Sequence, residues 1–157
     1  MSNFVDKLIM ELDKGIRVST QSIKEYKRPY PAQNISEPTL SKEEITHSAG
    51  LMRVNQAGEV CAQALYRGQS LSADLSNIRK QMEEAADEEL DHLAWCNNRL
   101  QELGEKPSLF NPLWYGMSFM LGVSAGLVGD EWSLGFVEET EKQVVKHLED
   151  HNKKIHP

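Results

Sequence analysis

Apolar residues recur at intervals of three and four along most of the chain, a spacing that places them on one side of an α-helix. Residues 4–16 show this pattern first. Their apolar positions are Phe4, Val5, Leu8, Ile9, Leu12 and Ile16, and their charged positions are Asp6, Lys7, Glu11 and Lys14. The pattern predicts a short amphipathic helix that packs on the body of the domain, with a membrane-surface role as the alternative. Prolines mark residues 28–40 as a loop.

Three long helices are predicted beyond this loop. The first opens at Ser41 and Glu44, which have the spacing of a capping box, and should end near residues 66–67 because Gly68 is a natural stop. The second runs from about Ser76 to Gly104, and the third from about Asp130 to residues 151–154. No stretch has the alternation typical of a strand, so the sequence predicts an all-α protein.

An uncharged segment, residues 107–129, separates the second and third long helices. Its 23 residues approach the ~20 that span a bilayer, but its prolines and modest hydrophobicity favour a buried or membrane-resting segment. We expect two short helical pieces that break at Pro112. Gly122 and Gly126, four residues apart, would allow a neighbouring helix to approach closely.

Composition limits the classes of function. A length of 157 residues fits one domain, divided here into residues 1–40 (helix and linker) and 41–157 (helical bundle). The formal charge of −7 argues against nucleic acid as a partner. The two cysteines, Cys61 and Cys96, are too few for a disulfide framework and favour a reducing compartment.

The strongest candidate chemistry lies at Glu89 and His92. Three residues apart on a helix, they face the same way, as metal ligands do in carboxylate-bridged helical bundles. Glu89 falls inside a stripe of apolar positions: Ile78, Met82, Ala85, Leu93, Cys96, Leu100 and Leu103. A buried carboxylate costs several kcal/mol unless it is compensated, so it needs a basic partner, a shared proton or a metal ion.

Two further carboxylates are predicted to face the same interior. Glu59 lies 15 residues before Asp74, in the break between helices, and Glu89 lies 15 residues after it, so an antiparallel hairpin brings both to one height. Glu141 falls inside the apolar stripe of the third long helix, whereas Glu138 lies at its margin and Glu139 faces away. That stripe consists of Leu134, Val137, Val144 and Leu148.

Oxygen ligands with an imidazole suit iron or manganese. The alternative is structural, because Glu and His are common on helices and usually form solvated or ion-paired groups. The chain itself supplies an example in Glu44 and His47, which have the same spacing. They lie 12 to 15 residues before Glu59, about 18–22 Å along a helix axis, and cannot share its metal ion. We interpret this second pair as structural.

Four stretches together are long and specific enough to resemble a known family. They are LMRVNQAGEVCAQALY at 51–66, EELDHLAWC at 88–96, NPLWY at 111–115 and SLGFV at 133–137. Over residues 40–151 the chain is similar to the bacterial demethoxyubiquinone hydroxylases, also called 3-demethoxyubiquinol 3-hydroxylases. The resemblance implies a ferritin-like four-helix bundle with two non-haem iron ions. It also implies O2-dependent mono-oxygenation of a lipid demethoxyquinol in ubiquinone biosynthesis.

The resemblance implies Glu59, Glu89, His92 and Glu141 as iron ligands, and reduced nicotinamide or the quinol itself as the electron source. The expected partners are a lipid quinone, O2, the membrane surface, other ubiquinone-biosynthesis proteins and a second copy of the chain. The expected location is peripheral, on the cytoplasmic face of the bacterial inner membrane, with residues 107–129 toward the lipid.

The sequence departs from the family at two places. Gln56 stands where the family usually has His. If that His supports the metal site through a hydrogen bond, Gln in its place could keep one hydrogen bond but would not titrate. The family's second Glu-x-x-His would lie beyond Pro157. We therefore expect this sequence to supply four of about six metal ligands and three of four core helices. The apolar groove that the fourth helix would cover should then be exposed. We interpret this as truncation. The alternatives are a helix supplied by another chain, a degenerate relative, a non-catalytic quinone-binding scaffold and a ferritin-like iron-binding protein.

Overall fold

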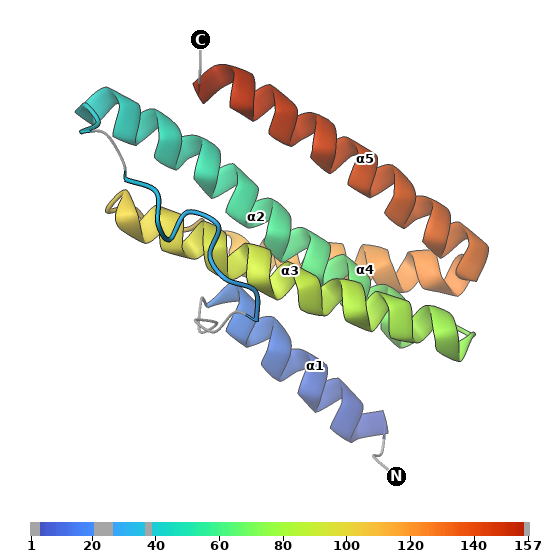
Figure 1. Cartoon of the computed structure of the whole chain (residues 1–157). Helices are drawn as coiled ribbons and strands as arrows, with labels where there is room; N and C mark the ends of the chain where they lie inside the picture. The colour runs from blue at the N-terminus through green and yellow to red at the C-terminus, as the bar shows by residue number, and fades with distance from the viewer. Residues whose placement is uncertain (1–3, 21–26, 37–38, 156–157) are drawn as a thin grey trace.

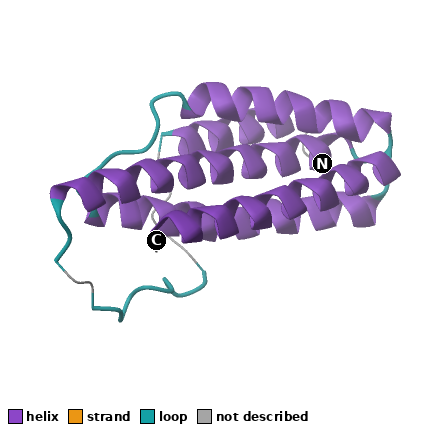
Figure 2. Ribbon diagram, turned by 90° about the horizontal axis from the view of Figure 1, so that it is seen from above, coloured by secondary structure: helices purple, strands orange, loops and turns teal. Residues whose placement is uncertain are grey.

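The computed structural model describes residues 4–20, 27–36 and 39–155, and its described part contains helices and loops but no strand (Figures 1 and 2). The helices are α1 (Phe4–Ser19), α2 (Lys42–Ser72), α3 (Ser76–Glu102), α4 (Asn111–Val128) and α5 (Asp130–Ile155). The all-α prediction is confirmed. Residues 37–38 of the predicted loop lie outside the described part. The side chains of Phe4, Val5 and Leu8 in α1 lie outside it as well. The division of the chain at residue 40 stays a prediction.

Helix α2 is the centre of the bundle. It forms an antiparallel hairpin with α3 and packs along α4, while α1 contacts α4 and α2 (Figure 1). Helix α5 folds back from the end of α4 and has a smaller contact with α2. The carboxylate of Asp130, the first residue of α5, accepts hydrogen bonds from the backbone N–H groups of Asp74 (3.2 Å) and Leu75 (2.8 Å). The start of α5 is therefore fastened to the turn of the α2–α3 hairpin.

The ends of the hairpin follow local sequence signals. The Ser41 hydroxyl accepts from the Glu44 N–H at 3.2 Å, and the Glu44 carboxylate accepts from the Ser41 N–H at 2.8 Å, which confirms the capping box. Beyond α3, Gly104 has a φ of +72°, which glycine adopts without steric cost, and the next N–H, of Glu105, donates to Leu100 O at 2.9 Å.

Two predicted helix breaks were wrong. Helix α2 continues through Gly68 to Ser72, and α4 is one helix rather than two pieces divided at Pro112. Pro112 lies in the first turn of α4, where the missing N–H has no helical partner to lose. Gly68 is kept in the helix by packing, since a Cβ atom there would lie 2.3 Å from the backbone oxygen of Phe119 in α4.

Glycines let α2 and α4 touch backbone to backbone, as the spacing of Gly122 and Gly126 predicted. A Cβ atom on Gly122 would lie 2.1 Å from Leu65 O, and one on Gly126 would lie 2.0 Å from Ser72 Oγ. No side chain fits at such distances. The glycines of α4 therefore fix its distance from the central helix and its rotation about its own axis.

The core consists of two clusters on either side of this contact. One contains Leu65, Tyr66, Ala73, Ile78, Met82 and Ala86, with Phe136 and Val137 of α5 packed against it. The other contains Val18, Val60, Ala64, Leu93 and Tyr115. Farther along α5, Val144, Val145 and Leu148 are exposed, in line with the expected exposure of apolar side chains on this helix. None of the described helices has the length and apolar character needed to cross a membrane.

The α2–α4 contact predicts how stability responds to one methyl group. Gly122→Ala places a Cβ against a backbone oxygen that has no freedom to move, so the free energy of unfolding should fall by about 1–3 kcal/mol in urea titration. Gly50→Ala is the matched control, because nothing lies within 4 Å of its added Cβ. It should leave stability unchanged or raise it by up to about 1 kcal/mol through helix propensity. Equal destabilisation by both changes would contradict the close contact.

Candidate metal centre

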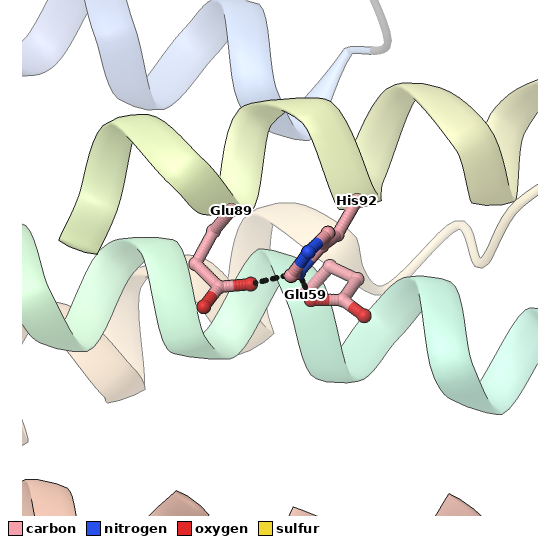
Figure 3. A group of neighbouring side chains, drawn as sticks. All are labelled: Glu59, Glu89 and His92. Atoms are coloured by element: carbon pink, nitrogen blue, oxygen red, sulfur yellow. Dashed lines mark hydrogen bonds and ion pairs between the residues drawn. The ribbon is translucent and has the colours of Figure 1, made fainter. Parts of the chain in front are cut away.

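Three of the predicted ligands converge between α2 and α3. Figure 3 shows Glu59 of α2 facing Glu89 and His92 of α3. His92 Nδ1 lies 3.0 Å from Glu89 Oε2 and 3.8 Å from Glu59 Oε2, and one ligand atom from each residue lies within 4.8 Å of the others. The two carboxylates are largely buried, with side chains 18% and 12% exposed for Glu59 and Glu89. The prediction that the hairpin brings Glu59 and Glu89 to one height is confirmed.

The electrostatics of this group match a site for a cation. Burial, and then the hydrogen bond and the charge of Glu89, raise the pKa of Glu59 well above its usual value. Burial also acts to raise the pKa of Glu89, but hydrogen bonds from His92 and Glu59 hold it below its usual value. Two buried carboxylates that face each other therefore disfavour a second uncompensated negative charge. A divalent cation would compensate both carboxylates, so the residues present fit a metal ion.

Cys96 lies one turn beyond His92 on α3, but among the described residues only Glu59, Glu89 and His92 bring ligand atoms within 4.8 Å of one another. Burial, together with the charges of Glu59 and Glu89, raises the pKa of Cys96 to about 12, which disfavours the thiolate form that binds metals. The donor set is thus two carboxylates and one imidazole, which suits iron or manganese.

The other predicted ligand, Glu141, lies beside the group rather than in it. It is exposed on α5 and accepts a hydrogen bond from the Tyr66 hydroxyl of α2. Its negative charge contributes to the raised pKa of Glu59, and the pKa of Tyr66 is raised by burial and by its bond to Glu141. Tyr66 therefore holds the carboxylate of Glu141 close to the centre. Periodicity placed Glu141 on the side of α5 that meets Tyr66 of α2, but the side chain is exposed rather than interior, and its role as a ligand stays a prediction.

The sequence did not predict Lys27 and Arg28, the two residues that contact α3 at Asp91 and His92. The backbone N–H groups of Lys27 and Arg28 donate to the buried Asp91 carboxylate at 2.7 and 3.3 Å, and Arg28 Nε donates to it at 3.0 Å. Arg28 Nη2 lies 3.4 Å from His92 Nε2, and the guanidinium lies 5.5 Å from the centre of the Trp95 ring. A buried carboxylate needs hydrogen-bond donors, but no pattern in the sequence indicates that Arg28, 63 residues before Asp91, supplies them.

Gln56 has a structural role, and so does the pair formed by Glu44 and His47. Gln56 is fully buried one turn before Glu59, and its carbonyl accepts from Asn111 Nδ2 at 2.9 Å, which ties α2 to the start of α4. This hydrogen bond joins Gln56 to α4 and not to the metal site, so the support of the site expected at this position stays a prediction. Glu44 takes part in the helix cap, and His47 is exposed, so the interpretation of this pair as structural agrees with the structure.

Comparison with known proteins places the chain in a family. The model of the family "Ubiquinone biosynthesis protein COQ7" matches residues 46–157. The chain belongs to the COQ7 family. The matched region contains Glu59, Glu89, His92 and Glu141, and it begins two residues after the capping Glu44.

Curated relatives agree with this assignment. The chain is 56% identical over 151 residues to the 3-demethoxyubiquinol 3-hydroxylase of Legionella pneumophila (strain Paris), covering 96% of this chain and 71% of the relative. It is 50% identical to the protein of that name from Marinomonas sp. (strain MWYL1), covering 96% and 72%, and 52% identical to that from Acinetobacter baylyi, covering 96% and 71%. No solved structure matches the chain.

The geometry of the COQ7-family centre predicts which carboxylates a metal ion needs. Glu89→Ala removes an oxygen from the group of three and should abolish high-affinity Fe(II) binding in anaerobic calorimetric titration. Glu44→Ala removes a carboxylate of the same sequence pattern that serves only the cap. It should leave Fe(II) affinity unchanged and cost about 0.5–2 kcal/mol of stability at most. Equal loss of Fe(II) binding in both variants would contradict the site as described.

Proposed function

We propose that this protein is a 3-demethoxyubiquinol 3-hydroxylase, a mono-oxygenase that adds one oxygen atom of O2 to the ring of a lipid demethoxyquinol in ubiquinone biosynthesis. The observation that carries the proposal is its 50–56% identity to proteins of that name over 96% of its length. The Glu59, Glu89 and His92 group supports it, because activation of O2 needs a redox-active cofactor and the chain assembles ligands for a metal one.

Glu59, Glu89 and His92 would hold non-haem iron, and Glu141 would join them from α5. When bound, the iron supplies the redox chemistry that activates O2. The protein's own contribution is to concentrate negative charge in a buried site before the metal arrives. Burial, and after it the hydrogen bond and charge of Glu89 and the charge of Glu141, raise the pKa of Glu59, so the site favours a compensating positive charge. Tyr66, through its hydrogen bond to Glu141, would position that carboxylate for the same centre.

Arg28 and Asp91 would orient the imidazole. Asp91 is buried and accepts three hydrogen bonds from residues 27 and 28, so this loop is pinned against α3 at the turn that carries His92. Arg28 Nη2 also donates to the backbone oxygen of Glu88 at 3.3 Å. These contacts fix the loop at residues 27–28 beside the turn of α3 that carries His92, and Arg28 Nη2 lies 3.4 Å from His92 Nε2.

A lipid substrate must reach the centre from a membrane, and α4 supplies a surface for it. Its exposed face carries Leu113, Trp114, Met117, Met120 and Leu121, preceded by Leu109 and Phe110. We propose that this apolar face rests on the cytoplasmic surface of the bacterial inner membrane, as a peripheral contact. The absence of charge from residues 107–129 supports this orientation, since burying apolar side chains in the lipid interface stabilises the contact.

The proposed function predicts a labelled product. The Fe(II)-loaded full chain, mixed with vesicles that contain a demethoxyquinol and supplied with 18O2, should form a hydroxylated quinol that carries one 18O atom by mass spectrometry. Parallel reactions with and without reduced nicotinamide identify the electron source. Glu89→Ala should lower product at least 100-fold, and Glu44→Ala should retain it. Iron binding with oxidation of Fe(II) but no labelled quinol would instead support an iron-binding protein, and quinol binding without iron would support a scaffold.

The role proposed for Glu141 predicts a graded loss. Glu141→Ala removes a carboxylate that lies beside the group of three, so Fe(II) affinity should fall by about 10–100-fold, less than in Glu89→Ala. Glu139→Ala is the matched control, because Glu139 is exposed on the same helix and accepts only from Gln143 Nε2 at 2.7 Å. Its Fe(II) affinity should equal that of the unmodified protein in the same anaerobic titration. An unchanged affinity in Glu141→Ala would remove Glu141 from the ligand set.

A further inference from the structure

His92 meets the two carboxylates and Arg28 through different ring nitrogens. Its Nδ1 lies 3.0 Å from Glu89 Oε2 and 3.8 Å from Glu59 Oε2, in the group that Figure 3 shows. Its Nε2 lies 3.4 Å from Arg28 Nη2. The contact with Arg28 thus orients the ring with Nδ1 toward the carboxylates, and Nδ1 is the nitrogen available to a metal ion held with them.

The guanidinium of Arg28 is held in place by contacts that do not involve His92. Arg28 Nε donates to Asp91 Oδ2 at 3.0 Å, and the Arg28 backbone N–H donates to the same oxygen at 3.3 Å. Nη2 also donates to Glu88 O at 3.3 Å, and the guanidinium lies 5.5 Å from the centre of the Trp95 ring. These contacts with α3 keep a positively charged donor beside Nε2 of the imidazole.

The contact with Arg28 selects which nitrogen of the neutral imidazole carries the proton. A guanidinium donates hydrogen bonds and cannot accept one, so its contact with Nε2 is favourable only when Nε2 offers a lone pair. The proton then lies on Nδ1, from which it is donated to Glu89 Oε2 at 3.0 Å. One neighbour of the ring is a donor and the other is an acceptor, and both select the same tautomer.

This tautomer cannot bind a metal ion through Nδ1. A ring nitrogen ligates a metal with its lone pair, so the proton must lie on the other nitrogen. Metal-bound imidazoles usually donate that second N–H to a carboxylate, a carbonyl oxygen or water. At His92 the neighbour of Nε2 is a donor instead, and its positive charge repels a cation. The metal-binding form of His92 is therefore the form that the Arg28 contact disfavours.

We propose that Arg28 competes with the metal ion for the imidazole of His92. Metal loading ends the hydrogen bond from Arg28 to Nε2: the proton on Nδ1 leaves, a proton is taken up at Nε2, and the ring stays neutral. Because the contact lowers the fraction of protein that can bind, it weakens the apparent metal affinity. The coupling is reciprocal, so a bound metal weakens the contact by the same factor. This inference rests on the function proposed for Glu59, Glu89 and His92.

Titration with Fe(II) tests the competition. Arg28→Gln replaces the charged donor by an amide whose oxygen can accept from Nε2, so Fe(II) affinity of the full chain should rise about tenfold in anaerobic calorimetry. Arg53→Gln is the matched control, because it removes the same charge from a guanidinium that donates to Glu105 Oε2 and Lys106 O, each at 2.9 Å. Its Fe(II) affinity should equal that of the unmodified protein. An unchanged or lower affinity in Arg28→Gln would overturn the proposal.

The tautomer of His92 gives a readout that needs no metal ion. In metal-free protein with 15N-labelled histidine, at a pH where the ring is neutral, NMR should show His92 protonated at Nδ1 and unprotonated at Nε2. The His92 signals are assigned by their loss in His92→Ala. The population protonated at Nε2 should grow in Arg28→Gln but not in Arg53→Gln. Unmodified, metal-free protein protonated mainly at Nε2 would contradict the competition.

Loading with Zn(II), a diamagnetic probe, extends these spectra to the metal-bound protein. Saturation should leave His92 protonated at Nε2, and a loaded protein still protonated at Nδ1 would count against the inference. Equal Fe(II) affinity in the unmodified protein and Arg28→Gln would remove this inference and leave the proposed function standing. Absence of Fe(II) binding from both proteins would remove the metal centre and the inference with it.

Discussion

Two carboxylates that face each other between α2 and α3 are the constraint on which the architecture of this protein depends. Glu59 and Glu89 are largely buried and repel each other, which raises the pKa of Glu59, while His92 lies 3.0 Å from Glu89 and partly compensates its charge. Such a pair costs stability unless the hairpin around it is held firmly. The capping box at the start of α2 and the carboxylate of Asp130, which holds the hairpin turn, provide that restraint.

The glycine contact between α2 and α4 extends this restraint to the rest of the bundle. Because no side chain fits between Gly122 and the Leu65 carbonyl, α4 has one position along α2. That position brings Asn111 within 2.9 Å of Gln56, one turn from Glu59, and directs Tyr115 toward α1. Backbone packing thus sets the surroundings of the metal centre and the apolar cluster around Tyr115 at the same time.

Local and periodic signals in the sequence predicted much of this arrangement. The capping box, the limits of α3 and the equal height of Glu59 and Glu89 follow from spacing alone, because helix periodicity and a short turn determine them. The predicted breaks at Gly68 and Pro112 failed since residue preference decides a helix end only where packing leaves it free. Arg28 was not predicted, because a loop residue that reaches Asp91 leaves no periodic pattern. Glu141 was placed on the correct face, but the hydrogen bond from Tyr66 depends on how α5 lies against α2.

Helix geometry explains how the α2–α3 pair carries a charged group and an apolar core cluster at neighbouring positions. On α2, Glu59 and Val60 are neighbours in sequence, yet the first meets Glu89 and His92 while the second packs against Tyr115. On α3, His92 and Leu93 divide in the same way. A rotation of about 100° between consecutive residues is enough to turn from a charged interior to an apolar wall. The α2–α3 hairpin therefore presents a site for a cation on one face and packs an apolar face against Val18 of α1 and Tyr115 of α4 on another.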